Sequence, residues 1–139
     1  MNQAATLAEL DERPCITRTL NIHGYHQNAE KFGALSLYGS DAPAIQNLAL
    51  NEAGLAERLH PDLPYTAAEV VWAAREEMAR TVEDVLARRT RALFLNARAA
   101  LAMAPRVAAL LAREQRRDAV WQASEVDRFA AVAAGYVAG

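Results

Sequence analysis

The sequence predicts an all-α protein: a compact bundle of about five to six helices that follows an irregular N-terminal arm. Apolar residues make up 53% of the 139 residues, but aromatic residues only 6%, and many of the apolar positions are alanine. Alanine has the highest intrinsic helix propensity, so this composition favours closely packed helices. The 6 glycines and 5 prolines lie mostly in the first half, which places the irregular backbone there.

The first 40 residues form the arm. A short helix is expected at residues 3–10, although it has no apolar neighbours nearby in the sequence to pack against. Residues 14–40 show no regular pattern, and so long an irregular stretch is uncommon inside a compact domain. We therefore interpret residues 1–40 as a linker that lies along a partner surface, and residues 41–139 as the helical domain.

The first helix of the bundle is expected to begin near Ser40 or Asp41, to hold Pro43 in its first turn and to end at Gly54. A rigid connector with two prolines follows at residues 59–65. The next helix begins with a capping box, in which Glu69 stands three residues after Thr66. Its apolar stripe contains Val70, Val71, Ala74 and Met78.

Helical patterns then continue to the end of the chain. Thr81 either restarts a helix or lies within a continuing one, and residues 88–91 are expected to form a break. The next helix is expected over residues 91–103, Pro105 opens another, and Asp118 caps the last. Short connections predict antiparallel neighbours. The inward positions expected in the 91–103 helix are Leu93, Phe94, Ala97, Ala100 and Leu101.

Charge and cysteine content exclude several classes of protein. The formal net charge of −2 lacks the basic surplus of a nucleic-acid-binding protein. The single cysteine, Cys15, excludes an internal disulfide and a cysteine-based zinc site, and is typical of a reducing, cytoplasmic compartment. The least charged stretch, residues 92–112, still contains Arg98 and Arg106, so no transmembrane segment is expected.

The most unusual stretch is charged. Glu76, Arg80, Asp84 and Arg88 are spaced four apart and would form one ladder of alternating sign on a continuous helix. One interpretation is a solvated stripe, which gains weight if Thr81 caps a new helix and breaks the ladder. The other is a polar seam that docks the domain onto a partner. The candidate docking residues are Arg80, Asp84, Arg88, Arg89 and Arg91.

No catalytic, cofactor-binding or metal-binding residue is predicted. The arginines at 88, 89 and 91 could hold a phosphate, but Glu83 and Asp84 can neutralise them instead. His23 and His26 lack the further ligands that zinc requires. The glycines match neither a dinucleotide-binding loop nor a P-loop.

Several stretches together resemble the C-terminal domain of aerobic, FAD-dependent glycerol-3-phosphate dehydrogenases. The family often has proline where this chain has Asn21. The resemblance is most specific in the long central string. It is carried by residues 13–17, 20–24, 37–42, 65, 68–73, 75–81, 83–91, 121–122 and the region of Tyr136.

The resemblance implies a parent enzyme that oxidises sn-glycerol 3-phosphate to dihydroxyacetone phosphate and passes electrons to FAD and then to quinone. The parent is expected to be peripheral to the cytoplasmic membrane. The FAD and substrate sites belong to an N-terminal region that this chain lacks. The chain would then be a helical cap that packs beside that flavin domain, inactive alone. A freestanding helical interaction module is the alternative, and the oligomeric state stays open.

Overall fold

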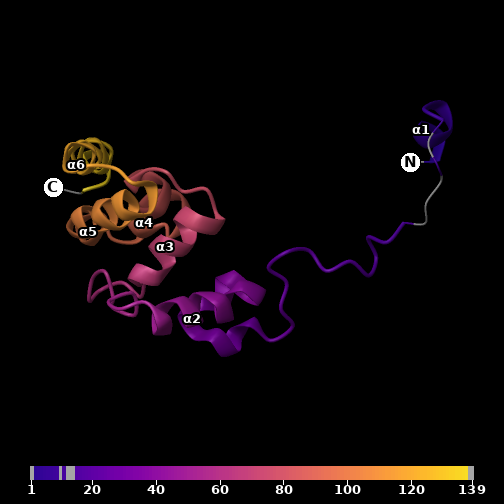
Figure 1. Cartoon of the computed structure of the whole chain (residues 1–139), viewed down its shortest axis with the longest axis horizontal. Helices are drawn as coiled ribbons and strands as arrows, with labels where there is room; N and C mark the ends of the chain where they lie inside the picture. Colours follow the sequence, from indigo (N-terminus) through magenta and orange to yellow (C-terminus); the bar gives the residue numbers. More distant parts are fainter. Residues whose placement is uncertain (1, 10, 12–14, 138–139) are drawn as a thin grey trace.

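A computed structural model describes residues 2–9, 11 and 15–137, and its regular structure is helical, which confirms the predicted all-α class (Figure 1). Within these residues, β-type pairing is limited to an isolated bridge between Arg58 and Thr66. The α-helices are α1 (Asn2–Leu7), α2 (Ala42–Asn51), α3 (Ala67–Glu76), α4 (Ala92–Leu95), α5 (Ala97–Gln115) and α6 (Ala119–Ala133). They are joined by the 3-10 helices η1 (Ala29–Asp41) and η3 (Ala134–Tyr136) and by the π-helix η2 (Asp84–Arg89).

The core is built around α5, which packs against α3, α4, η2 and α6. Its buried face includes Met103, Val107 and Leu111, and Phe129 of α6 is buried with them. Burial of this apolar surface is the main stabilising contribution to the bundle. No helix in the described ranges is both long enough and apolar enough to cross a membrane.

Polar caps begin the last two long helices. The Asp118 carboxylate accepts a hydrogen bond from the Trp121 amide at 2.8 Å, which confirms the cap predicted for the final helix. The Asn96 side chain accepts from the Ala99 amide at 3.0 Å and starts α5. Both bonds satisfy an amide that the first helical turn leaves unpaired.

The prediction of a helix over residues 91–103, with another opened by Pro105, is wrong. The cap at Asn96 separates the four-residue helix α4 from α5, and Pro105 lies inside α5. Proline removes one backbone hydrogen bond from a helix. The neighbouring side chains of Met103, Ala104, Val107 and Ala108 are all buried, and their packing holds the helix together across this gap.

Two side chains predicted to face the core lie at the surface. Met78 follows the end of α3 in a left-handed conformation, with φ of 56°, and its side chain is 76% exposed. Phe94 is 58% exposed because α4 is too short to continue the inward face, and its ring packs edge-on against Tyr136 at 5.4 Å.

The arm differs from the prediction in its second half. Helix α1 lies apart from the bundle, and residues 15–28 reach from it to the helical body without regular helix (Figure 1). Residues from Ala29 onward form η1, so helical turns begin about a dozen residues before Asp41. Leu10, Arg13 and Pro14, where the predicted helix ends and the resemblance begins, lie outside the described residues.

Candidate domain-docking site

Glu76, Arg80, Asp84 and Arg88 do not form one ladder, because the continuous helix that such a ladder needs is interrupted after Glu76. Helix α3 ends at Glu76, and the chain turns at the left-handed Met78 before a new helical segment leads into η2. The pair that remains from the ladder joins Arg88 to Asp84 at 2.6 Å.

Thr81 caps the new segment, which is the outcome that gives weight to the solvated stripe over one continuous docking seam. The Thr81 hydroxyl accepts from the Asp84 amide at 3.1 Å, while Asp84 Oδ2 accepts from the amides of Thr81 at 2.9 Å and Arg80 at 3.0 Å. Partial burial raises the pKa of Asp84, but these bonds and the bond from Arg88 outweigh it, so the net pKa lies below its ordinary value.

The arginines of the candidate docking set divide into two groups. Arg88 pairs with Glu83 and Asp84, each at 2.6 Å, and Arg89 donates to the backbone carbonyl of Glu77 at 2.7 Å. Their charges therefore stabilise the domain itself. Arg80 and Arg91 have exposed side chains, and neither belongs to an ion pair found within the described ranges.

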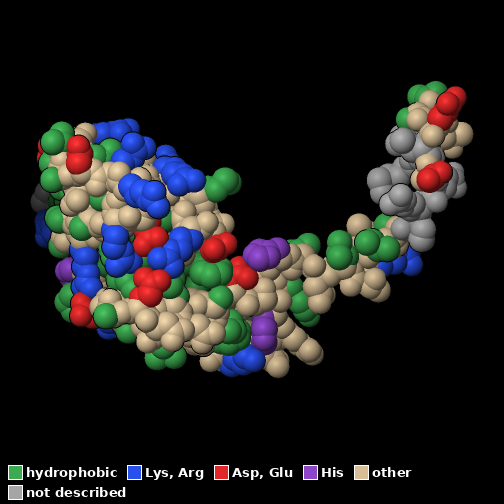
Figure 2. Space-filling view, viewed as in Figure 1, with side chains coloured by type: hydrophobic (Ala, Val, Ile, Leu, Met, Phe, Trp, Pro, Cys, Tyr) green, Lys and Arg blue, Asp and Glu red, His purple; other side chains and the backbone are tan. Residues whose placement is uncertain are grey.

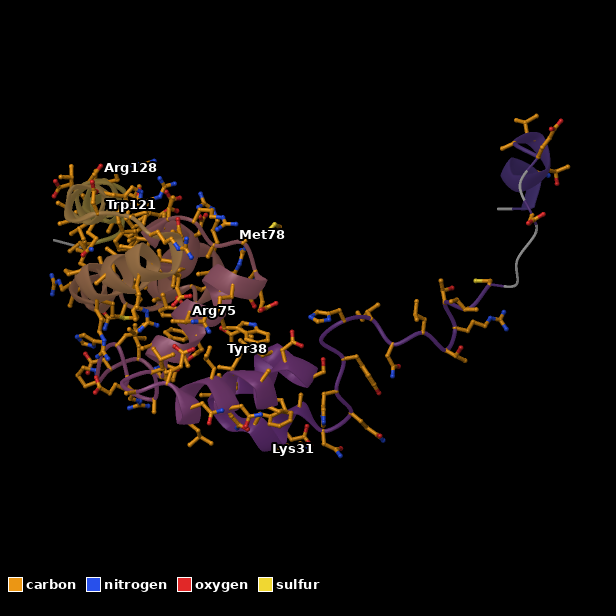
Figure 3. All side chains as sticks on the ribbon, viewed as in Figure 1. Lys31, Tyr38, Arg75, Met78, Trp121 and Arg128 are labelled. Atoms are coloured by element: carbon orange, nitrogen blue, oxygen red, sulfur yellow. The ribbon has the colours of Figure 1, made fainter. Side chains whose placement is uncertain are left out.

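A cavity of about 390 Å³ lies where η1 meets α3 and η2. Figure 3 shows Tyr38 on η1, pointing toward α3. The cavity brings Arg88 and Arg89 of the docking set together with residues that are distant in the sequence. Its lining consists of Ala34, Leu37, Tyr38, Tyr65, Glu69, Glu77, Arg88, Arg89 and Thr90.

Glu69 is the buried carboxyl of this cavity, with 3% of its surface exposed. It accepts from the Thr66 amide at 2.7 Å and from the Thr66 hydroxyl at 3.1 Å, which confirms the predicted capping box. Burial raises its pKa, and bonds from Thr66 and Tyr38 only partly oppose that effect. Burial and the nearby Glu69 also raise the pKa of Tyr38 far above its ordinary value.

Glu77 is the second carboxyl of the cavity. Burial raises its pKa, and the nearby Arg89, 3.5 Å away, opposes the rise. The cavity therefore contains one carboxyl without a cationic partner, Glu69, and one, Glu77, that pairs with the guanidinium of Arg89. Such an arrangement binds protons more firmly than isolated glutamates do.

Two sets of polar contacts join residues that are distant in the sequence, and no local pattern predicts them. Glu125 of α6 is buried, and it accepts from the Val82 amide at 3.1 Å and from Arg128 at 2.8 Å. It thus caps a segment 43 residues away, a distance at which no local pattern gives a signal. Arg75 bridges Glu114 at 2.7 Å and Glu52 at 2.8 Å, and so joins α3 to α5 and to the end of α2.

The histidines of the arm make structural contacts. His23 Nε2 lies 2.8 Å from Asp41 Oδ2, and His26 accepts from the Asn28 amide at 3.0 Å. In the ranges that the structure describes, no three His, Cys, Asp or Glu side chains are grouped to hold a metal ion. We therefore assign the histidines to the geometry of the arm.

The chain matches one known family and several curated proteins. A family model described as the C-terminal domain of alpha-glycerophosphate oxidase matches residues 15–122. A glycerol-3-phosphate dehydrogenase of Arabidopsis thaliana is 37% identical over 91 residues, which are 66% of this chain and 14% of that protein. A probable glycerol-3-phosphate dehydrogenase of Caenorhabditis elegans is 30% identical over 138 residues, covering 84% of this chain and 19% of the relative.

A probable glycerol-3-phosphate dehydrogenase of Dictyostelium discoideum is 46% identical over 59 residues, covering 42% of this chain and 9% of the relative. The chain thus spans between about a tenth and a fifth of the length of these relatives. No solved structure matches it significantly.

The names of these relatives correct the expected location. All three are described as mitochondrial, so the prediction of a cytoplasmic protein is wrong. That prediction depended on a single unpaired cysteine, which indicates a reducing environment but does not distinguish one such compartment from another.

Proposed function

The chain belongs to the family of the C-terminal domain of alpha-glycerophosphate oxidase, and from this membership we propose that it docks onto the catalytic body of a glycerol-3-phosphate dehydrogenase. The observation that carries the proposal is the family match over residues 15–122, which includes residues 15–40 of the arm and most of the bundle. The resemblance seen in the sequence is thereby confirmed.

The proposed parent enzyme oxidises sn-glycerol 3-phosphate to dihydroxyacetone phosphate, with FAD as the electron acceptor and quinone as the next. A dinucleotide site requires a glycine-rich loop between a parallel strand and a helix. The described residues of this chain supply helices and an isolated bridge, which do not fit that requirement. We therefore place the FAD and substrate chemistry in the body and assign no catalytic step to this domain.

The charged segment supports this docking proposal because its side chains fall into two groups. Asp84, Arg88 and Arg89 are held in ion pairs that maintain the segment's shape, while Arg80 and Arg91 present exposed guanidinium groups. Figure 2 shows basic and acidic side chains interleaved over the helical body. Exposed arginines suit recognition of carboxylates on a partner surface because the planar guanidinium binds them in a bidentate manner.

A charge reversal at Arg91 tests the proposal. We expect Arg91→Glu to weaken the complex between this chain and a separately produced catalytic body by about tenfold or more, with a melting temperature within about 2 °C of wild type. The measurements are calorimetric titration and thermal unfolding. Wild-type chain that fails to bind the body and to restore glycerol-3-phosphate oxidation would contradict the proposed function.

Arg116→Glu is the matched control. Arg116 has a left-handed φ of 56°, close to the 58° of Arg91, and is also exposed, but it lies at the far end of α5. Its reversal should leave binding unchanged. Arg88→Glu should lower both stability and binding, because it breaks two internal ion pairs. Equal binding by the Arg91 and Arg116 variants would remove Arg91 from the docking surface.

A further inference from the structure

Two glycines, Gly24 and Gly39, cross closely where the irregular part of the arm meets η1. The Ser40 amide donates to the Gly24 carbonyl at 3.1 Å, and Gly39 lies directly beside the same carbonyl. A Cβ atom on Gly39 would lie 1.8 Å from the Gly24 oxygen, which is far inside van der Waals contact. Gly39 also has a positive φ of 52°, a conformation that side chains disfavour. Any side chain at position 39 therefore requires the backbone of this crossing to move.

A second contact fixes the same point of the arm. His23 Nε2 and Asp41 Oδ2 are 2.8 Å apart, and Asp41 directly precedes α2. Residues 23 and 24 are therefore tied to residues 40 and 41, where η1 leads into α2, by a side-chain bond and a backbone bond. Two successive attachments constrain the direction in which the chain leaves the body, whereas a single one would allow rotation about it.

On the N-terminal side of this crossing, the arm carries aliphatic side chains that the helical domain does not cover. Figure 1 shows residues 15–22 extending away from the helices, and Figure 2 shows apolar side chains along them. The exposed fractions are 62% for Ile16, 57% for Leu20 and 78% for Ile22. A turn in which the Leu20 amide donates to the Ile16 carbonyl at 3.0 Å brings two of these residues close together along the chain. Exposed aliphatic side chains gathered in this way indicate a surface that a partner covers.

The position of the arm identifies that partner. The matched family is a C-terminal domain and its match begins at Cys15, so the arm belongs to the domain and faces the polypeptide that precedes it. The relatives have more than four fifths of their length outside the matched part. The partner that covers these aliphatic side chains is therefore the catalytic body of the same parent polypeptide, and it contacts them through an apolar patch on its surface.

We propose that the Gly24–Gly39 crossing aims the arm, and that Ile16, Leu20 and Ile22 dock it onto an apolar face of the catalytic body. This inference rests on the proposed function and adds a docking element separate from the charged segment. The crossing sets the angle between the helical domain and the catalytic body, and the contacts of the aliphatic side chains maintain that angle.

Gly39→Ala tests the crossing, and Gly33→Ala is its matched control. Gly33 lies in the same element with φ of 58° and ψ of −119°, against 52° and −115° for Gly39. A Cβ at Gly33 meets nothing within 4 Å, so both variants carry the left-handed strain but only Gly39→Ala has the clash. In the chain alone, hydrogen exchange at the Ser40 amide should accelerate in Gly39→Ala and stay near wild type in Gly33→Ala.

Association is measured in the intact parent polypeptide carrying an inserted protease site ahead of Cys15. After cleavage, we expect the wild-type halves to stay together and the dissociation constant of Gly39→Ala to rise about tenfold or more, with Gly33→Ala near wild type. Unchanged association in a Gly39→Ala variant that has lost protection at Ser40 would overturn the aiming role of the crossing.

Leu20→Asp and Ile22→Asp test the aliphatic contact, with Asn21→Asp as the control that adds the same charge between them. The two aliphatic variants should dissociate after cleavage while the control stays associated, because a carboxylate does not fit an apolar patch. Equal behaviour of all three would overturn the contact. Dissociation of the cleaved wild type would instead refute the proposed function, so the two failures are distinguishable.

Discussion

The two helical segments on either side of Met78 begin with the same local motif and acquire opposite electrostatic properties. In α3, Thr66 and Glu69 cap each other, and before η2 Thr81 and Asp84 do the same three residues apart. Glu69 is 3% exposed and bonds to neutral donors, and its pKa is raised. Asp84 is more exposed and pairs with Arg88, and its pKa is lowered.

This difference separates what a capping motif determines from what its surroundings determine. The motif satisfies amides at the start of a helix wherever it occurs. The charge state of the acidic member depends on burial and on nearby cations. Glu69 also bonds to Tyr38, so the first cap attaches η1 to α3 across the cavity, whereas the second organises only its own segment.

The largest effect should come from removing the buried cap. Glu69→Ala leaves the donors of Thr66 and Tyr38 without an acceptor and should lower the free energy of unfolding by about 3 kcal/mol, measured by urea unfolding. Glu69→Gln retains an acceptor and should cost about 1 kcal/mol. Asp84→Ala should cost about half as much as Glu69→Ala, since water reaches its donors. Equal losses for the two alanine variants would mean that burial does not distinguish the caps.

A smaller and more even effect is expected at the threonines. Thr66→Ala and Thr81→Ala should each lower the free energy of unfolding by about 1 kcal/mol, because each removes the hydroxyl of an N-cap. Similar values would confirm that the local motifs are equivalent and that the contrast belongs to the acids. No change in melting temperature for Thr66→Ala would place the start of α3 elsewhere.

The smallest effect is a dependence on pH of opposite sign at the two caps. A carboxyl whose pKa is raised on folding favours the folded state when protonated, so the contribution of Glu69 is lost as pH rises above its ordinary 4.5. The contribution of Asp84 is present above its ordinary 3.8 and is lost as pH falls through its lowered pKa.

Urea unfolding between about pH 3 and pH 7 measures both effects as differences from wild type. Glu69→Gln should gain stability relative to wild type as pH rises, and Asp84→Asn should lose it. Subtraction cancels the titration of other groups that the variants share with wild type. The same sign for both variants would show that the two carboxyls have similar environments.

Local signals in the sequence were reliable where the deciding contacts are local. The capping box at Thr66 and the cap at Asp118 depend on bonds between residues three apart, and the structure has them. The break predicted at residues 88–91 also occurs, between the end of η2 at Arg89 and the start of α4 at Ala92. Helical periodicity places Met78 and Phe94 on a buried face, but both are exposed, because periodicity does not encode where a helix ends. Proline locally favours a helix start at Pro105, but α5 continues through it, because packing against other helices holds α5 together.

The sequence by itself determined the all-α class, the helix caps and the family to which the domain belongs, because composition, short motifs and strings of side chains carry these directly. Only the tertiary structure decided that Glu125 caps a segment 43 residues away and that Gly24 and Gly39 meet at the root of the arm. It also decided which arginines form ion pairs within the domain. These outcomes depend on which distant segments come into contact, and that follows from the packing of the whole core.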